Sequence, residues 1–217
     1  MDRSHGWWRH AVVLSLLPLL AGCALVSPSV PQAYQQTLAH YNLPLVAPPS
    51  EAPPPSVDVE RVAAQVHSLV NRVRTEAGQA PLAWCDDVAQ VAQAHSTDMA
   101  SGNYFSHTDQ HGRSATDRGT VQGITCQRRS DTQLMEGLGE NLFWTTQYDS
   151  YELASHSAVP MNVAWKEADQ IAEEAVTAWL KSPGHRANLL SALYTKQGIG
   201  VAIRPGVGVY ITQNFCF

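Results

Sequence analysis

Hydrophobic and polar positions alternate along residues 57–217 with two different periods. Val59, Val62, Val66 and Val70 recur at helical spacing, and Gly78 follows where the C-terminal cap of a helix is expected. These positions predict a first helix that ends just before Gly78.

The same period predicts two further helices. One covers about residues 86–101, with Asp86 or Asp87 as its N-cap and with His95 on its apolar stripe. The other covers about residues 162–181 and stops at Pro183, because the residue before a proline is disfavoured in the α region. On an apolar stripe, His95 is expected to be a hydrogen-bonded core histidine. Glu173 and Glu174, on the last helix, are expected on a solvated face.

The C-terminal part changes to the strand period. Residues 198–204 and 207–214 are β-branched or alternating runs separated by Pro205 and Gly206, which predicts a hairpin. A third strand is expected to include residues 141–144. Helices around a small antiparallel sheet define an α+β domain.

The N-terminal part has a different composition. Arg3 and Arg9 flank an apolar run from about residue 11 to 20, which is too short for a membrane-spanning helix of roughly 20 residues and is typical of a signal peptide. The run ends in Leu-Ala-Gly-Cys at residues 20–23, which resembles the bacterial lipobox. This resemblance implies cleavage after residue 22 and lipid on Cys23; an ordinary secretory signal with an incidental cysteine is the alternative.

Residues 23–56 contain most of the 13 prolines and predict an extended linker. In the polyproline II form, at about 3.1 Å per residue, it would reach about 100 Å. The predicted organisation is therefore a signal peptide at 1–22, a lipidated cysteine with its linker at 23–56, and one domain at 57–217.

Charge and cysteine content limit the function. The chain has 14 Lys and Arg against 19 Asp and Glu, and removal of residues 1–22 makes it one charge more acidic, so nucleic acid is not an expected partner. Cys85, Cys126 and Cys216 remain for an oxidising compartment. Any one pair of them could form a disulfide, or all three could be buried thiols, and no zinc-finger spacing is present.

Five fragments carry a resemblance to a known family. They are FSH at 105–107, GEN at 139–141, SPGHRANLL at 182–190, GIGVA at 198–202 and YITQNF at 210–215. In this order they resemble the CAP superfamily, which includes cysteine-rich secretory, antigen 5 and pathogenesis-related 1 proteins, and especially its bacterial SCP-domain branch. The resemblance covers nearly all of residues 57–217 and implies an α-β-α sandwich.

The resemblance also implies a cleft with two histidines and two acidic residues. His107, Glu140 and His185 match three of these positions, whereas Ser182 stands where the second acidic residue is expected, and Glu136 is a substitute for it. Two imidazoles and one carboxylate could hold zinc or another divalent metal with an open position. The alternative is structural, with Glu140 bracing the sheet and the histidines bonded to backbone carbonyls.

Other reactive residues give weaker signals. His111 follows His107 by four residues but lies in a predicted loop, and no His-Glu-x-x-His motif exists. Ser106 lies beside His107 without a nucleophile elbow, and Cys216 ends an apolar strand, so a serine hydrolase, a cysteine protease and a redox enzyme are not supported. Residues 145–163 form a longer connection than is usual in bacterial relatives; with Tyr148, Tyr151, His156 and Met161 it could be a lid over the cleft or a surface loop.

These observations predict a lipid-anchored protein of the bacterial cell envelope, tethered to the membrane through Cys23. Its domain is expected to be a non-catalytic module that binds an envelope polymer, a lipid or a protein in a cleft of His107, Glu140 and His185. One alternative is a metal-dependent hydrolase of envelope or extracellular polymers, in which bound metal activates a water molecule. Another is a spacer near peptidoglycan, for which the linker is the evidence.

Overall fold

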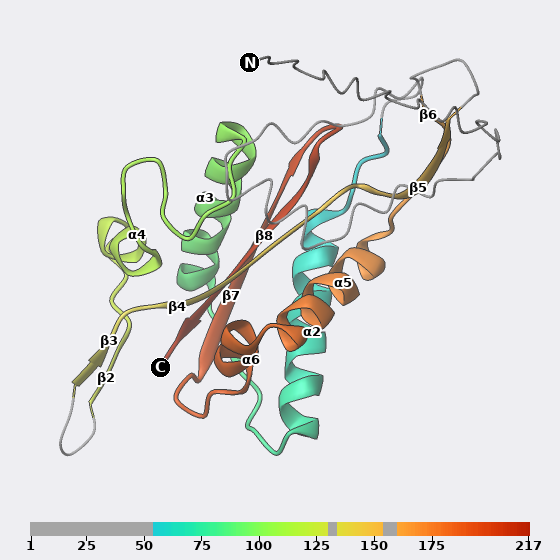
Figure 1. Cartoon of the computed structure of the whole chain (residues 1–217). Helices are drawn as coiled ribbons and strands as arrows, with labels where there is room; N and C mark the ends of the chain where they lie inside the picture. Colours follow the sequence, from blue (N-terminus) through green and yellow to red (C-terminus); the bar gives the residue numbers. More distant parts are fainter. Residues whose placement is uncertain (1–53, 130–133, 154–159) are drawn as a thin grey trace, which may run out of the picture.

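The computed structural model of the chain describes residues 54–129, 134–153 and 160–217 (Figure 1). The signal peptide, Cys23 and nearly all of the predicted linker lie outside these residues. No helix among the described residues has the length and apolar character needed to cross a membrane.

The described residues form helices and short strands around a central sheet. The helices are α2 (Val59–Glu76), α3 (Asp86–Gly102), α4 (Ala115–Val121), α5 (Ala168–Lys181) and α6 (Pro183–Leu190). The strands are β1 (Ala83–Trp84), β2 (Gln127–Arg129), β3 (Leu134–Glu136), β4 (Gly139–Thr145), β5 (Tyr148–Leu153), β6 (Pro160–Trp165), β7 (Lys196–Arg204) and β8 (Gly208–Cys216).

The central sheet has the strand order β1-β7-β8-β4. The predicted hairpin is confirmed: β7 and β8 pair in antiparallel register from Lys196 and Cys216 to Arg204 and Gly208. The predicted third strand is also confirmed as β4, which pairs antiparallel with β8 and forms one edge of the sheet. The short strand β1 pairs parallel with β7 at the other edge.

Helices cover both faces of this sheet, as Figure 1 shows. Ile199 and Val201 of β7 belong to the core that also contains residues of α2 and α5. Gly198 and Gly200 alternate with them on the opposite face, where a Cβ at either position would overlap the backbone of Ala89 or Gln93 in α3. Glycine there lets α3 lie directly on the sheet, and the expected α-β-α sandwich of the α+β class is confirmed.

Helix α2 forms as the sequence predicts. The Asp58 carboxylate caps it by accepting a hydrogen bond from the Arg61 backbone N–H at 2.9 Å, and Gly78 follows its end with a φ of 75°. Helix α3 is present but is capped differently: its N-cap is Cys85, without a side-chain cap bond. Asp86 instead accepts a hydrogen bond from the Trp84 indole N–H at 2.7 Å.

The prediction of a helix from residue 162 is wrong at its start. Residues 160–165 form β6, which pairs with β5, and Asn162 has a φ of 51° that an α-helix does not allow. Helix α5 begins only at Ala168. Just before it, the Lys166 backbone N–H donates a hydrogen bond to the Gln147 carbonyl at 2.9 Å.

The connection of residues 145–163, predicted to be either a lid or a surface loop, contains β5 and the first part of β6, which pair antiparallel. Tyr148 and Tyr151 are in edge contact, with 5.5 Å between their ring centroids. A role as a lid stays a prediction. His156 lies outside the described residues, and so does the side chain of Met161. Glu173 is exposed as expected. Glu174 differs, because its carboxylate pairs with the buried Lys166 ammonium at 2.7 Å.

A disulfide joins Cys126 to Cys216, with 5.5 Å between the Cα atoms and 90 residues between them in sequence. It ties the last strand of the sheet to the segment that leads into β2. Cys85 is the free cysteine of the described residues and packs beside this disulfide with Val88. The sequence leaves three pairings open, and the structure has the one between Cys126 and Cys216.

Candidate functional site

His107 is held in position by the loop that follows α3. Asn103, in the left-handed conformation with a φ of 53°, ends the helix, and the buried carboxylate of Asp109 folds the loop by accepting hydrogen bonds from the backbone N–H groups of His111 and Arg113. Nε2 of His95, on α3, also contacts the Ser106 carbonyl of this loop at 2.9 Å. His95 is thus the buried, hydrogen-bonded histidine that its apolar stripe predicts.

Glu140 lies on β4 at the edge of the sheet, and only 5% of its side chain is exposed. One carboxylate oxygen, Oε1, accepts a hydrogen bond from Nδ1 of His107 at 2.9 Å. The other, Oε2, forms an ion pair with the guanidinium of Arg118 on α4. The His107 side chain is 58% exposed, so a buried ion pair orients an imidazole that faces solvent.

Arg118 is a residue of this site that the sequence did not predict. Its guanidinium is as buried as the carboxylate and also donates to the carbonyls of His107 and Arg113 at 3.0 and 2.9 Å. The capping box of Ser114 and Asp117 marks the start of α4 in the sequence. No local pattern indicates that the arginine one position after Asp117 is buried.

His185 approaches from the other face of the sheet, in the first turn of α6. Its ring centroid lies 6.2 Å from that of His107. Two amides attach this helix to β4: Asn141 donates to the His185 carbonyl at 3.2 Å, and Asn188 donates to the Glu140 carbonyl at 3.1 Å. The structure therefore brings His107, Glu140 and His185 together at the β4 edge, while their role in binding stays a prediction.

The other residues considered from sequence lie elsewhere or face away. Glu136, proposed as the second acid, is exposed on β3 and accepts a hydrogen bond from Gln127 at 3.0 Å. Ser182 is the N-cap of α6 without a side-chain cap bond. The Ser106 hydroxyl accepts from the Thr108 backbone N–H at 3.1 Å, and His111 is exposed on the same loop.

This arrangement does not present a three-ligand metal site. Both oxygens of Glu140 are engaged, one by a guanidinium that a cation would have to displace. Within the part of the chain that the structure describes, no group of three or more His, Cys, Asp or Glu side chains is placed to hold a metal ion. The predicted zinc site at His107, Glu140 and His185 does not fit this geometry and stays a sequence-based prediction.

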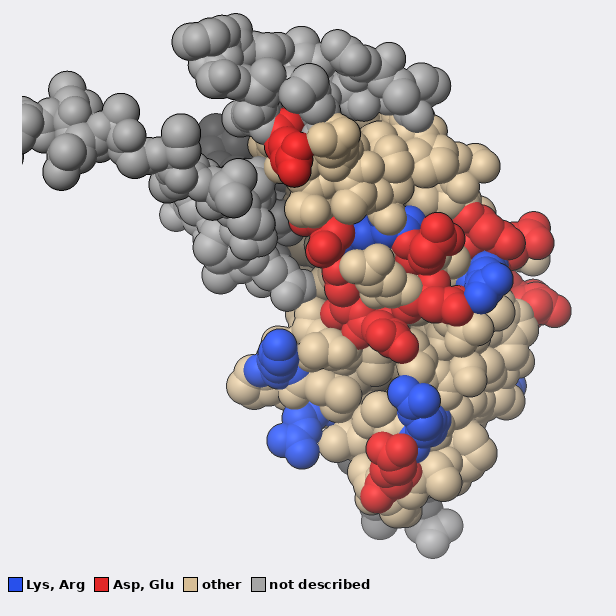
Figure 2. All heavy atoms as spheres, turned by 90° about the vertical axis from the view of Figure 1, so that its right-hand side faces the viewer, with Lys and Arg blue, Asp and Glu red and all other residues tan. Residues whose placement is uncertain are grey.

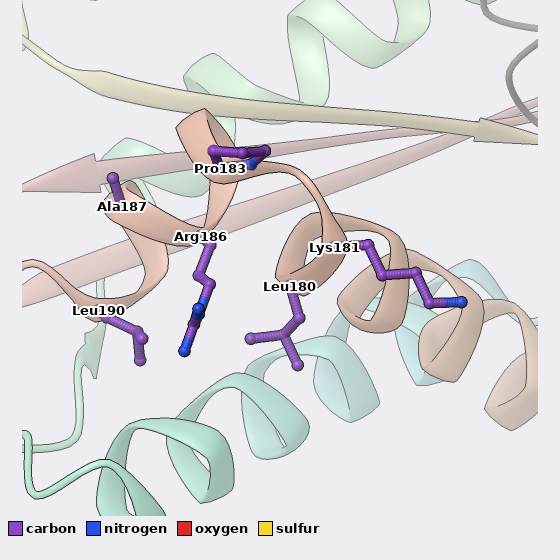
Figure 3. A pocket seen from close by; sticks show the side chains of 6 residues that line it. All are labelled: Leu180, Lys181, Pro183, Arg186, Ala187 and Leu190. Atoms are coloured by element: carbon purple, nitrogen blue, oxygen red, sulfur yellow. The ribbon is translucent and has the colours of Figure 1, made fainter.

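A separate open groove lies where α5 meets α6, with a volume of about 380 Å³ (Figure 3). Leu180, Arg186 and Leu190 point from these helices toward α2 in this view. The groove is mainly apolar, with Lys181 and Arg186 as its charged side chains, and its lining residues are Leu180, Lys181, Pro183, Arg186, Ala187 and Leu190. It is distinct from the cleft, since His185 is not among them.

The fold, with His107, Glu140 and His185 together at the β4 edge, defines a class of small α-β-α domains, and comparison with known proteins identifies the family. The Cysteine-rich secretory protein family, CAP, matches residues 67–215, so the chain belongs to this family. It is 34% identical over 151 residues to the uncharacterized membrane protein YlbC of Bacillus subtilis (strain 168), covering 70% of this chain and 33% of YlbC. It is 29% identical over 136 residues to the uncharacterized protein YkwD of the same organism, covering 63% of this chain and 40% of YkwD.

Two solved structures show the same fold. An extracellular protein containing an SCP domain from Bacillus anthracis str. Ames has a TM-score of 0.52 and 29% identity, over 72% of this chain and 40% of that one. An outer surface protein from Borrelia burgdorferi has a TM-score of 0.54 and 15% identity, over 74% of this chain and 95% of that one. The chain thus spans well under half of YlbC, YkwD and the B. anthracis protein, and these relatives are bacterial proteins described as extracellular or membrane proteins where a location is given.

Replacing Arg118 should show how strongly the site depends on charge compensation. In Arg118→Leu the Glu140 carboxylate stays buried without its cation, and we expect a loss of about 3–5 kcal/mol in the free energy of unfolding by urea. Adding Glu140→Gln should recover part of this loss. Arg61→Leu is the matched control, because its pair with Asp169 is exposed and little change is expected. Equal losses in the two single variants would contradict a special role for the buried pair.

Stability should also depend on pH. Burial lowers the pKa of His67, His95 and His185 below 6.5, and the nearby His107 lowers the pKa of His185 further. Each group binds a proton more readily in the unfolded chain, so the free energy of unfolding should be highest above pH 6.5 and fall as the pH drops below it. Urea unfolding midpoints between pH 8 and 5 measure this, and His185→Gln should reduce the slope. A midpoint that rises toward pH 5 would be the opposite result.

Proposed function

We propose that this chain is a lipid-anchored protein of the bacterial cell envelope whose CAP domain binds a ligand or partner without turning it over. The binding site is the cleft at the β4 edge, formed by His107, Glu140 and His185. The single observation that carries this proposal is the buried ion pair of Glu140 and Arg118, which orients the exposed imidazole of His107.

The physical argument concerns what such a pair contributes. A buried ion pair loses the hydration of two charges, so apolar residues of similar volume are often at least as stabilising. Here the pair fixes the direction of a solvent-facing ring, with Nδ1 bonded to Glu140 and Nε2 left for another partner. Because Nδ1 carries the proton in this bond, Nε2 of neutral His107 is an acceptor. This arrangement suits recognition of a ligand that donates a hydrogen bond.

The neighbouring groups supply no nucleophile to this imidazole. Ser106 turns its hydroxyl into its own loop, and Cys85 packs beside the disulfide rather than in the cleft. General-base catalysis by His107 needs a nucleophile within hydrogen-bond reach, and neither Ser106 nor Cys85 is placed to be one. Binding is therefore the function that this geometry supports best.

The charge on one face of the domain disfavours nucleic acid as a ligand. Figure 2 shows acidic side chains gathered on the face at the right-hand side of Figure 1, with fewer basic groups among them. Asp58, Glu167 and Asp169 are the acidic residues that interact with Arg61. Such a surface repels a phosphate backbone.

The predicted anchor can be tested directly. With the lipobox at residues 20–23, the full chain expressed in a bacterium should incorporate labelled palmitate and sediment with membranes. Cys23→Ser should lose both properties, whereas Cys85→Ser should retain them. Membrane association that survives Cys23→Ser would remove the lipid anchor from this proposal.

The cleft requires a separate binding experiment. The mature chain carrying Cys23→Ser would be titrated against peptidoglycan sacculi and against phospholipid vesicles, and retention of one of them is expected. Loss of a ligand hydrogen bond in His107→Ala should weaken binding about tenfold. His111→Ala is the matched control, because His111 is exposed on the same loop without a contact to Glu140.

Four results would contradict parts of this proposal. Binding that His107→Ala leaves unchanged, or no retention by either probe, would exclude the cleft as the site for these ligands. Soluble fragments released from sacculi would favour the hydrolase instead. Zinc bound at about one ion per chain, and lost in His185→Ala, would establish the metal centre that the sequence predicts.

A further inference from the structure

A continuous chain of buried side-chain amides runs across one face of the sheet, from the β4 edge to α2. Asn141 on β4, Gln213 on β8 and Gln197 on β7 are each fully buried and lie on the face that α2, α5 and α6 cover. Asn141 bonds to Gln213 at 3.2 Å, Gln213 to Gln197 at 2.6 Å, and Gln197 to His67 of α2 at 2.8 Å. We call these three amides with His67 the amide relay.

Backbone carbonyls at the cleft determine the direction of every bond in the relay. Nδ2 of Asn188 lies 3.1 Å from the Glu140 carbonyl, and Nδ2 of Asn141 lies 3.2 Å from the His185 carbonyl. A carbonyl only accepts, so both amides must present their NH₂ groups to it. Asn141 then accepts from Asn188 at 3.0 Å through its oxygen and donates to Oε1 of Gln213.

The remaining bonds follow from this orientation. With its oxygen used by Asn141, Gln213 donates through Nε2 to the oxygen of Gln197. Gln197 in turn has only Nε2 to offer to Nδ1 of His67. All donors in the relay therefore point from the cleft toward α2, and Nδ1 of His67 has to be an acceptor.

Asn71 lies beside His67 at the far end of the relay. Its amide is oriented by the backbone of Leu82, which donates to Oδ1 at 2.7 Å and accepts from Nδ2 at 2.9 Å. Nδ2 of Asn71 also lies 3.3 Å from Nε2 of His67. A neutral imidazole has one acceptor nitrogen, and the 2.8 Å contact with Gln197 is the shorter of the two. The proton of His67 is therefore on Nε2, and the 3.3 Å contact of this nitrogen with Nδ2 of Asn71 is not a hydrogen bond.

We propose that His67 is a positioning residue for the cleft, because the amide relay transmits its hydrogen-bond requirement to the His185 carbonyl and so holds His185 against His107. If Nδ1 of His67 became a donor, each amide would have to flip, and an amide oxygen of Asn141 would face the carbonyl of His185. Its importance for binding rests on the proposed function, whereas the hydrogen-bond direction does not.

A purely stabilising role accounts less well for the relay. Gln213 lies between Ile211 and Phe215 on a face that is otherwise apolar, and all three amides are fully removed from water. Replacing a fully bonded buried polar pair by apolar groups of the same shape is often nearly neutral. What an apolar replacement could not supply is a directional connection to the carbonyl of one particular residue, His185.

Nuclear magnetic resonance of the ¹⁵N-labelled mature chain, carrying Cys23→Ser and kept at pH 8, tests the proposal. In the otherwise unaltered chain, the ring nitrogen shifts of His67 should show the Nε2–H tautomer. Gln213→Leu removes the middle of the relay and should displace the ring resonances of His185. Thr212→Val is the matched control: Thr212 is the neighbouring buried residue, bonded to Ser96 on the opposite face at 2.8 Å, and its loss should leave the His185 ring unmoved.

An Nδ1–H tautomer in His67 would overturn the relay whatever the cleft binds, and this measurement does not depend on whether Gln213→Leu folds. A His185 ring that Gln213→Leu leaves in place, or that Thr212→Val displaces equally, would also overturn the positioning role. If the tautomer and the coupling hold but His107→Ala binds the sacculi or vesicles as well as the unaltered cleft does, the proposed function fails and the relay stands.

Discussion

The carboxylate of Glu140 is the group on which the arrangement of the cleft depends. It is buried at the open edge of the sheet, where the loop after α3 and the first turn of α6 meet from opposite faces. A buried charge in this place requires a partner, and Arg118 supplies it while also holding the His107 and Arg113 carbonyls. The ion pair therefore fixes the direction of His107 and the path of its loop with one set of contacts.

The two faces of the central hairpin solve different packing problems. On the α3 face, Gly198 and Gly200 bring helix and strand backbones into direct contact, so the helix that leads to His107 has a defined distance from the sheet. On the other face, apolar side chains pack against α2 and α5, and the amide relay runs between them. Backbone packing fixes the distance between the sheet and the helix that leads to His107, and directional hydrogen bonds hold His185.

The sequence predicts those parts of the fold and cleft that depend on local patterns. Helix α2, the β7-β8 hairpin and β4 follow from hydrophobic period, and the ordered motifs lead to the family and the three cleft residues. The predicted start of α5 was wrong because Trp165 continues the helical period of the sequence. In the structure, Asn162 is left-handed and the segment pairs with β5, so no helix forms there. Arginine and glutamine usually lie at the surface. Only packing between elements far apart in sequence buries Arg118, Gln197 and Gln213. The sequence therefore names the histidines and the carboxylate but not the groups that orient them.

Arg118 also changes the significance of Ser182. With serine in place of a second acid, the sequence suggests a cleft with one negative charge and two imidazoles, which is a poor but conceivable metal site. With the guanidinium bonded to Glu140, that charge is already compensated inside the protein. A divalent cation would then gain two neutral nitrogen ligands while facing a fixed positive charge nearby. A neutral ligand that donates a hydrogen bond to His107, which is the kind of ligand that we propose for this site, meets no such opposition.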